Sequence, residues 1–163
     1  PPAGPGWCHE ADKASESEAH GIGPFVQENH SSSSKGVLRG LHYQLPPRAQ
    51  GKLVRCVAGA LFDVVVDLRR GSQTFGKHTS TTLRPDGAMF WIPPGFAHGF
   101  QALEDATEMV YHVDDEYSPG HERSLLWNDP RLRIPWPLLP PILATKDATA
   151  NPWDEAEIPE AWR

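Results

Sequence analysis

The chain has 163 residues, of which 39% are hydrophobic and 22% charged, a size and composition typical of one folded domain over residues 1–163. The net charge of −6 disfavours nucleic acid as a partner, because proteins that bind its backbone carry a basic surplus. No apolar run approaches the roughly 18 residues that span a bilayer, and no charged start leads into an apolar signal core, so we expect no membrane association.

The beginning of the chain has little periodicity. Residues 1–23 are small, polar and charged, which predicts a poorly structured segment, and residues 31–35 have the sequence SSSSK, which predicts a low-complexity linker. Cys8 and Cys56 are the only cysteines, and neither belongs to a CxxC pair. We therefore expect two reduced thiols and a cytoplasmic location.

Short runs rich in β-branched and aromatic residues follow, and each is bounded by Pro or Gly. Such runs predict strands, and their spacing of roughly ten residues without an amphipathic helix predicts an antiparallel sandwich or barrel. The step through Gly59 predicts a tight hairpin. The expected strands are residues 36–44, 52–58, 61–68, 77–83, 89–92, 99–103 and 108–113.

Two polar features interrupt this pattern. In the expected strand 61–68, alternation puts Asp63 and Asp67 on one face, which predicts a polar cavity, a partner cation or solvent beside them. From Pro130 onward the chain is rich in Pro and Trp, which predicts an extended segment wrapped over the barrel. Residues 151–163 are an acidic tail, and the carboxylates of Asp154–Glu160 predict a solvated end.

The histidines leave several chemistries open. Arg39 and His42 lie three residues apart in an expected strand, so both can line one pocket only if Gly40 or a local twist alters the alternation. A single strand histidine such as His42 or His98 is more often a structural hydrogen-bonding group than a base. The glycines that flank His98 permit a ligand to approach closely, and they also permit tight turns.

A metal site is the natural alternative for a barrel that contains histidines. Small metal-binding barrels place two His one residue apart on a strand, and neither His42 nor His98 has such a neighbour, so we expect no metal. The motifs GxGxxG, GxxxxGK[ST] and GxSxG are absent as well, so nucleoside-triphosphate hydrolysis and serine esterase chemistry have no support.

A series of uncommon motifs runs along the chain: GPFVQEN at 23–29, GVLRGLHYQ at 36–44, AQGKLVR at 49–55, FDVVVDL at 62–68, SQTFG at 72–76, WIPPGFAHGF at 91–100, YSPGHER at 117–123 and LWND at 126–129. In order and spacing, residues 23–150 resemble the dTDP-4-dehydrorhamnose 3,5-epimerase family. The resemblance implies a mainly β fold, a cupin double-stranded β-helix (jelly-roll barrel) with short peripheral helices. It also implies a homodimer that works without metal or other cofactor.

The resemblance implies inversion at C3, C5 or both of a dTDP-4-keto-6-deoxy sugar, in dTDP-rhamnose or related deoxysugar biosynthesis. The C4 ketone acidifies the neighbouring C–H groups, so a base can form an enolate and an acid on the other face can reprotonate it. His42 matches the base, and Asp147 matches the carboxylate that orients it. Tyr111 matches the opposite-face acid, and Lys52 matches the cation near the enolate oxygen.

The resemblance also implies a substrate-binding set. Arg39 matches a diphosphate contact, for which a guanidinium is suited. Gln27 and His98 match positions in the substrate pocket, and Asp63 matches a carboxylate that orients His98. Glu10 matches an acidic residue of the nucleotide-binding motif near the start of the chain.

The first segment departs from the family pattern R-G-x-F-x-E, which marks residues 1–23 as atypical or truncated. Pro5 stands for the Arg and Cys8 for the Phe, although Glu10 fits. Losing a phosphate-binding Arg alone is expected to weaken substrate binding by about 1.5–3 kcal/mol. Glu116 replaces the first Tyr of a common Tyr-Tyr pair, and His112 replaces a common Lys.

Three other functions remain open at this point. A ketoisomerase on the same barrel would move the carbonyl without inversion, although Tyr111 argues against it because isomerisation needs only one face. A catalytically weak cupin that binds a nucleotide sugar is motivated by the altered first segment. A metal-dependent oxygenase would lose activity with a chelator.

Overall fold

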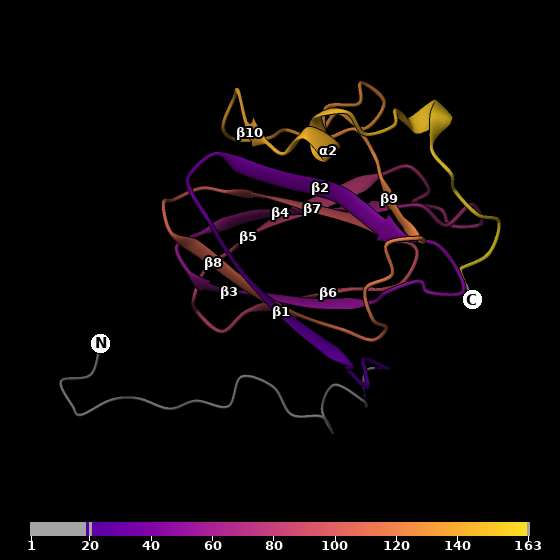
Figure 1. Cartoon of the computed structure of the whole chain (residues 1–163), viewed down its shortest axis with the longest axis horizontal. Helices are drawn as coiled ribbons and strands as arrows, with labels where there is room; N and C mark the ends of the chain where they lie inside the picture. Colours follow the sequence, from indigo (N-terminus) through magenta and orange to yellow (C-terminus); the bar gives the residue numbers. More distant parts are fainter. Residues whose placement is uncertain (1–18, 20, 163) are drawn as a thin grey trace.

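The computed structural model describes residue 19 and residues 21–162, which form two β-sheets stacked face to face (Figure 1). The smaller sheet has the strand order β1-β8-β3-β6, and the larger has the order β10-β2-β7-β4-β5, with β9 also paired to β2. The strands are β1 (Gln27–Ser33), β2 (Val37–Gln44), β3 (Lys52–Ala58), β4 (Leu61–Asp67), β5 (His78–Leu83), β6 (Met89–Ile92), β7 (Phe96–Ala102), β8 (Thr107–Val113), β9 (Glu122–Ser124) and β10 (Ile142–Leu143). Two short helices follow, α2 (Thr145–Ala148) and the 3-10 helix η1 (Trp153–Glu155).

The expected strands are all present, and the mainly β, antiparallel fold class is confirmed. Their bounds agree to within one residue except in β7, which begins at Phe96 rather than at residue 99. The earlier start follows from pairing, because Phe96 and His98 lie opposite Asp67 and Val65 of β4. Within the described residues, no helix is long and apolar enough to cross a membrane.

The prediction of a linker at residues 31–35 is wrong for its first three residues, which belong to β1. Ser31 and Ser33 lie opposite Met109 and Thr107 of β8, and exposure alternates along the strand. Pairing with β8 therefore overrides the weak strand preference of a serine run. The prediction for the beginning of the chain, residues 1–18 and 20, lies outside the described residues.

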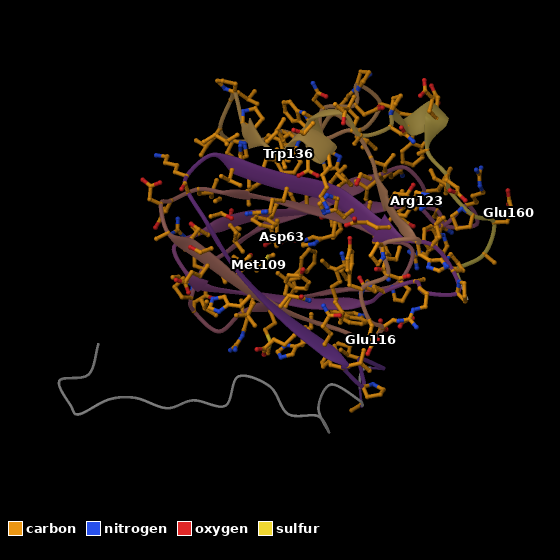
Figure 2. All side chains as sticks on the ribbon, in the orientation of Figure 1. Asp63, Met109, Glu116, Arg123, Trp136 and Glu160 are labelled. Atoms are coloured by element: carbon orange, nitrogen blue, oxygen red, sulfur yellow. The ribbon has the colours of Figure 1, made fainter. Side chains whose placement is uncertain are left out.

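The segment after Pro130 packs over the outer face of the larger sheet, as predicted (Figure 1). Leu132 and Trp136 are buried in a core that it shares with that sheet, and Figure 2 labels Trp136 at this level. Trp136 also donates its indole N–H to the carbonyl oxygen of Trp127 at 2.8 Å. Apolar contact with β2 and β4 thus fixes a segment that has little regular structure of its own.

The acidic side chains of the predicted solvated end, Asp154–Glu160, are exposed, but the two tryptophans that flank this stretch are buried. Trp153 and Trp162 are buried, and the Trp162 indole N–H donates to the carbonyl oxygen of Leu68 at 3.3 Å. Tyr43 donates its hydroxyl to the carbonyl oxygen of Glu157 at 3.0 Å. Three of the exposed acidic side chains, Asp154, Glu157 and Glu160, pair with arginines.

Both carboxylates of β4 have partners. Asp67 accepts hydrogen bonds from the Arg69 guanidinium at 2.8 Å and from the Thr74 hydroxyl at 2.6 Å. Burial alone would raise the pKa of Asp67. Hydrogen bonds from Arg69, Ser72 and Thr74 have a larger, opposite effect, so the pKa lies well below its usual range. Arg69 is therefore the partner cation that the sequence predicts for Asp67, while Asp63 lies beside a histidine.

The space between the sheets is apolar at one end. Side chains from both sheets meet there in one cluster, which includes Val54, Leu61 and Val65. Phe100 and Met109 belong to this cluster and also border a cavity that opens at the other end. The fold thus closes one end of the sandwich by packing and leaves the other end for polar side chains.

Candidate active site

A cavity of about 410 Å³ lies between the two sheets. Its wall takes side chains from β1, β2, β3, β7, β8, β9 and α2. Of the residues that the sequence singles out, Asp63 does not line it and Glu10 lies outside the described residues. Those that do line it are Gln27, Arg39, His42, Lys52, His98, Tyr111 and Asp147.

An irregularity in β2 brings Arg39 and His42 to the same cavity. Arg39 pairs with Phe100 and His42 with His98, so three steps along β2 match two steps along β7. Gly40 has a φ of +120°, and a Cβ there would lie 2.5 Å from the Cα of a glycine in β7. The predicted role of Gly40 in breaking the alternation is confirmed, since only glycine fits this backbone and this contact.

His42 and Asp147 form a hydrogen-bonded pair from opposite ends of the sequence. The distance from His42 Nε2 to Asp147 Oδ1 is 2.6 Å, and the Asp147 side chain is only 1% exposed. An ionised carboxylate only accepts hydrogen bonds, so Nε2 is assigned as the donor and Nδ1 is left to accept a proton. A histidine held in this way can act as a general base.

Lys52 and Tyr111 come from the smaller sheet, which faces the sheet that carries His42. Burial and, more weakly, Lys146 lower the pKa of Lys52 to about 8, although Glu122 and Asp63 oppose the change. Burial and the Glu122 carboxylate raise the pKa of Tyr111, which keeps its phenol neutral. His42 and a neutral phenol therefore come from facing sheets that line one cavity, with Lys52 on the same sheet as the phenol.

A second histidine and carboxylate pair is buried at the cavity, with His98 in the wall and Asp63 behind it. His98 Nε2 lies 3.0 Å from both carboxylate oxygens of Asp63, and the Asp63 side chain has no exposed surface. Figure 2 shows Asp63 between the sheets. Asp63 therefore reaches the cavity only through His98, in agreement with the orienting contact that the resemblance implies.

The wall also holds a charged network that the sequence did not single out. Glu122 accepts hydrogen bonds from the Tyr117 hydroxyl at 3.0 Å and from Lys146 Nζ at 3.2 Å. Burial raises the pKa of Glu122, but these two donors lower it more, while the same bond raises the pKa of Tyr117. The signals were present, because Tyr117 and Glu122 lie in the YSPGHER motif and Lys146 precedes Asp147.

The substituted residues Glu116 and His112 lie away from the cavity wall. The Glu116 side chain is 72% exposed and has Arg48 Nη2 at 3.7 Å, and Figure 2 labels it near the lower edge of the molecule. His112 pairs with Glu28 at 2.8 Å. Pro5, Cys8 and Glu10 lie outside the described residues. Within residues 19 and 21–162, no group of three or more His, Cys, Asp or Glu side chains is placed to hold a metal ion.

The model of the family described as dTDP-4-dehydrorhamnose 3,5-epimerase matches residues 4–155. The chain belongs to this family. The dTDP-4-dehydrorhamnose 3,5-epimerase of Shigella flexneri is 52% identical over 134 residues, which cover 82% of this chain and 74% of the relative. The resemblance that the motifs carry is therefore confirmed.

Solved structures of epimerases share the fold. The epimerase from Legionella pneumophila in complex with dTDP-4-keto-L-rhamnose has a TM-score of 0.85 and 45% identity, covering 91% of this chain and 80% of that one. ChmJ, a 3'-monoepimerase from Streptomyces bikiniensis in complex with dTDP-quinovose, has a TM-score of 0.82 and 36% identity, covering 89% and 75%. The predicted cupin-type jelly roll is thus confirmed for this chain.

Proposed function

We propose that this chain is an epimerase that inverts C3, C5 or both of a dTDP-4-keto-6-deoxy sugar, in dTDP-rhamnose or related deoxysugar biosynthesis. One observation carries the proposal: His42 and Tyr111 lie on opposite sheets across one cavity, with Lys52 in the same wall. Inversion needs a base and an acid on opposite faces of the sugar ring. Family membership and the relatives that bind dTDP-sugars support the same substrate class.

His42 takes the proton in the first step. Its Nδ1 removes a proton from a carbon next to the C4 ketone, the C–H electron pair becomes the C=C bond, and the carbonyl electrons move to oxygen. Asp147 holds the ring and stabilises the imidazolium that forms. Lys52, with a pKa of about 8, stays mostly protonated at neutral pH and stabilises the enolate oxygen.

Tyr111 returns a proton in the second step. Its hydroxyl protonates the same carbon from the opposite face, and the enolate collapses to the ketone with the centre inverted. The raised pKa of Tyr111 keeps the hydroxyl protonated until the enolate forms. The Arg39 charge lowers the pKa of the same phenol and so stabilises the tyrosinate that is left. Exchange with solvent then restores both residues.

The rest of the wall suits an anionic sugar nucleotide. We assign Arg39 to the diphosphate, and Gln27 and His98 to the substrate pocket, with Asp63 holding His98 in orientation. Glu10 keeps its assignment as a nucleotide contact by resemblance alone. No metal or other cofactor takes part in the proposed steps.

A homodimer is part of the same proposal. The face of the smaller sheet that points away from the cavity carries a cluster of aromatic and apolar groups, in which Phe25 contacts Trp91 and His112. Among the described residues, the wrapping segment packs on the larger sheet, so it does not cover this cluster. Light scattering with size-exclusion chromatography tests the dimer, and a monomeric mass at micromolar concentration would overturn it. The cytoplasmic location stays a prediction.

The proposed reaction is tested by proton NMR of dTDP-4-keto-6-deoxyglucose in D2O with the protein added. Loss of the C3 and C5 proton signals identifies a double epimerase, and loss of one identifies a single-site enzyme. Migration of the carbonyl would identify a ketoisomerase instead. No exchange, with a ligand-induced rise in melting temperature, would leave a protein that only binds the nucleotide sugar.

A further inference from the structure

Gln44, the last residue of β2, holds a surface segment by its side chain. It is buried to 4% exposure, and its Nε2 donates to the carbonyl oxygens of Arg48 at 2.6 Å and Glu116 at 3.3 Å. Its Oε1 accepts the backbone N–H of Ser118 at 2.7 Å. Its backbone pairs with Glu122 in β9, so one residue anchors both ends of residues 116–122.

Two further glutamines bind backbone groups of the same segment that Gln44 does not contact, those of Asp115 and Tyr117. Gln50 Nε2 donates to the carbonyl oxygen of Asp115 at 2.7 Å. Gln27 Oε1 accepts the backbone N–H of Tyr117 at 3.0 Å. Side-chain amides therefore hold four consecutive residues, 115–118, and all three glutamines line the cavity.

The segment held in this way carries Tyr117, whose side chain borders the cavity and is 51% exposed. An exposed tyrosine on a loop has little packing to fix its ring, so the backbone beneath it has to supply the rigidity. The hydroxyl of Tyr117 donates a hydrogen bond to the Glu122 carboxylate, which also accepts one from Lys146. The position of this charged rim therefore depends on where residues 115–118 lie.

We propose that Gln44, together with Gln27 and Gln50, is a positioning residue that fixes Tyr117 and Glu122 at the cavity rim for substrate binding. The proposal rests on the proposed function, because the substrate that the rim receives is the sugar nucleotide. Gln44 acts on binding rather than on proton transfer, since its side chain bonds to the segment and not to His42 or Asp147.

The chain offers a matched control in Gln101. It is fully buried in β7, and it holds Leu138 by the same pair of bonds: its Nε2 donates to the carbonyl oxygen at 2.7 Å, and its Oε1 accepts the N–H at 3.0 Å. Gln101 does not line the cavity. Replacing either glutamine removes one donated and one accepted bond from a surface segment, and Gln44→Leu also removes the bond to Arg48, but only Gln44 contacts the rim segment.

The experiment compares Gln44→Leu with Gln101→Leu in steady-state epimerisation and in hydrogen exchange of the free protein. For Gln44→Leu we expect KM to rise about tenfold with kcat within about twofold, because a loose rim weakens binding. The backbone amides of Tyr117 and Ser118 should exchange faster. Gln101→Leu should lower the melting temperature while KM and the exchange of these two amides stay unchanged.

A double-mutant cycle with Tyr117→Ala isolates the positioning role. If Gln44 acts through the rim, Gln44→Leu adds little to the KM of the Tyr117→Ala protein. An undiminished tenfold effect in that background, or an equal KM effect of Gln101→Leu, would overturn the proposal. Gln50→Ala removes one hydrogen bond of a half-buried side chain and should raise KM about threefold. This variant replaces Gln44→Leu in the experiment if Gln44→Leu does not fold.

Failure of the proposed function stays distinguishable from failure of this inference. If the wild-type protein turns over no keto sugar, the epimerase proposal fails. Amide exchange at Tyr117 and Ser118 needs no substrate, so it still tests whether Gln44 orders the segment. Unchanged exchange in Gln44→Leu would show that the glutamine does not order the segment, and the positioning role would be lost.

Discussion

The two ends of the space between the sheets are built on the same strands, yet they do different work. On β8, Met109 is buried in the apolar cluster and borders the cavity, while Tyr111, two residues further, lines the cavity and packs against the cluster. On β3, Val54 is in the cluster and Lys52 is in the cavity wall. A change of residue type two positions along one strand face therefore separates the packed core from the polar site, because side chains of a strand alternate between its faces.

Replacing His42 by Ala should have the largest effect at the cavity end. We expect kcat for epimerisation to fall about 10³-fold or more, because the base is removed, while the melting temperature changes little. Solvent-proton exchange into the substrate, followed by NMR in D2O, is the measurement. Exchange at a near-normal rate would remove His42 from the base role.

Leu61→Ala is the matching change at the closed end. Leu61 is fully buried in the apolar cluster and does not line the cavity, so the cavity left behind should lower the free energy of unfolding by about 3 kcal/mol. Below its melting temperature the variant should keep kcat/KM within about twofold. Urea unfolding and steady-state kinetics on one sample test both statements. A large loss of kcat/KM in the folded variant would mean that the two ends are not independent.

Tyr111→Phe sharpens the division of labour inside the cavity. Removing the hydroxyl should slow inversion about 10²-fold while deprotonation, seen as solvent exchange with retained configuration, falls less. The two rates are read from one NMR time course. If both fall equally, Tyr111 is not a separate acid. Phe at this position keeps the ring and its packing, so the fold should be unaffected.

The pH dependence gives the smallest effect and concerns Lys52. Because its pKa is lowered to about 8 from 10.5, the folded protein gives up this proton before the unfolded chain does. The unfolded chain therefore binds more protons between about pH 8 and 10.5, and the contribution of Lys52 to the free energy of unfolding rises with pH in that window. The kcat should decline above about pH 8 as the cation is lost. Lys52→Met should be slower and should lack this decline, and an unchanged pH profile would exclude Lys52 as its source.

Most of the fold follows from local patterns. The β-branched runs around Val54 and Val64 predict strands with nearly their observed bounds, because each run is bounded by Pro or Gly and packs in a buried sheet. Local patterns do not predict the strand at the serines of β1, since their pairing with β8 depends on residues far along the chain. Local patterns do not predict the burial of Trp153 and Trp162 either, because the acidic residues around them predict solvent exposure.

The candidate site divides in the same way. A break in alternation between Arg39 and His42 could be predicted from their spacing, with Gly40 or a local twist as its cause, because a regular strand would put the two side chains on opposite faces. The residues from Tyr117 to Lys146 lie in or beside motifs of the sequence, but their network could not be predicted, because it joins a loop, β9 and α2 by side chains alone. Residue chemistry indicates what a site can do, whereas contacts between distant segments decide which residues meet.

The pairing of His42 with Asp147 spans 105 positions of sequence. During synthesis, both sheets up to β9 emerge before the residue that orients the base does. A nascent chain that stops between these two points carries the imidazole without its carboxylate, and it also lacks Trp153 and Trp162, which are buried in the outer cluster. Turnover therefore requires that synthesis has passed Asp147, so an activity assay on a coupled ribosome extract would not register chains released before that residue.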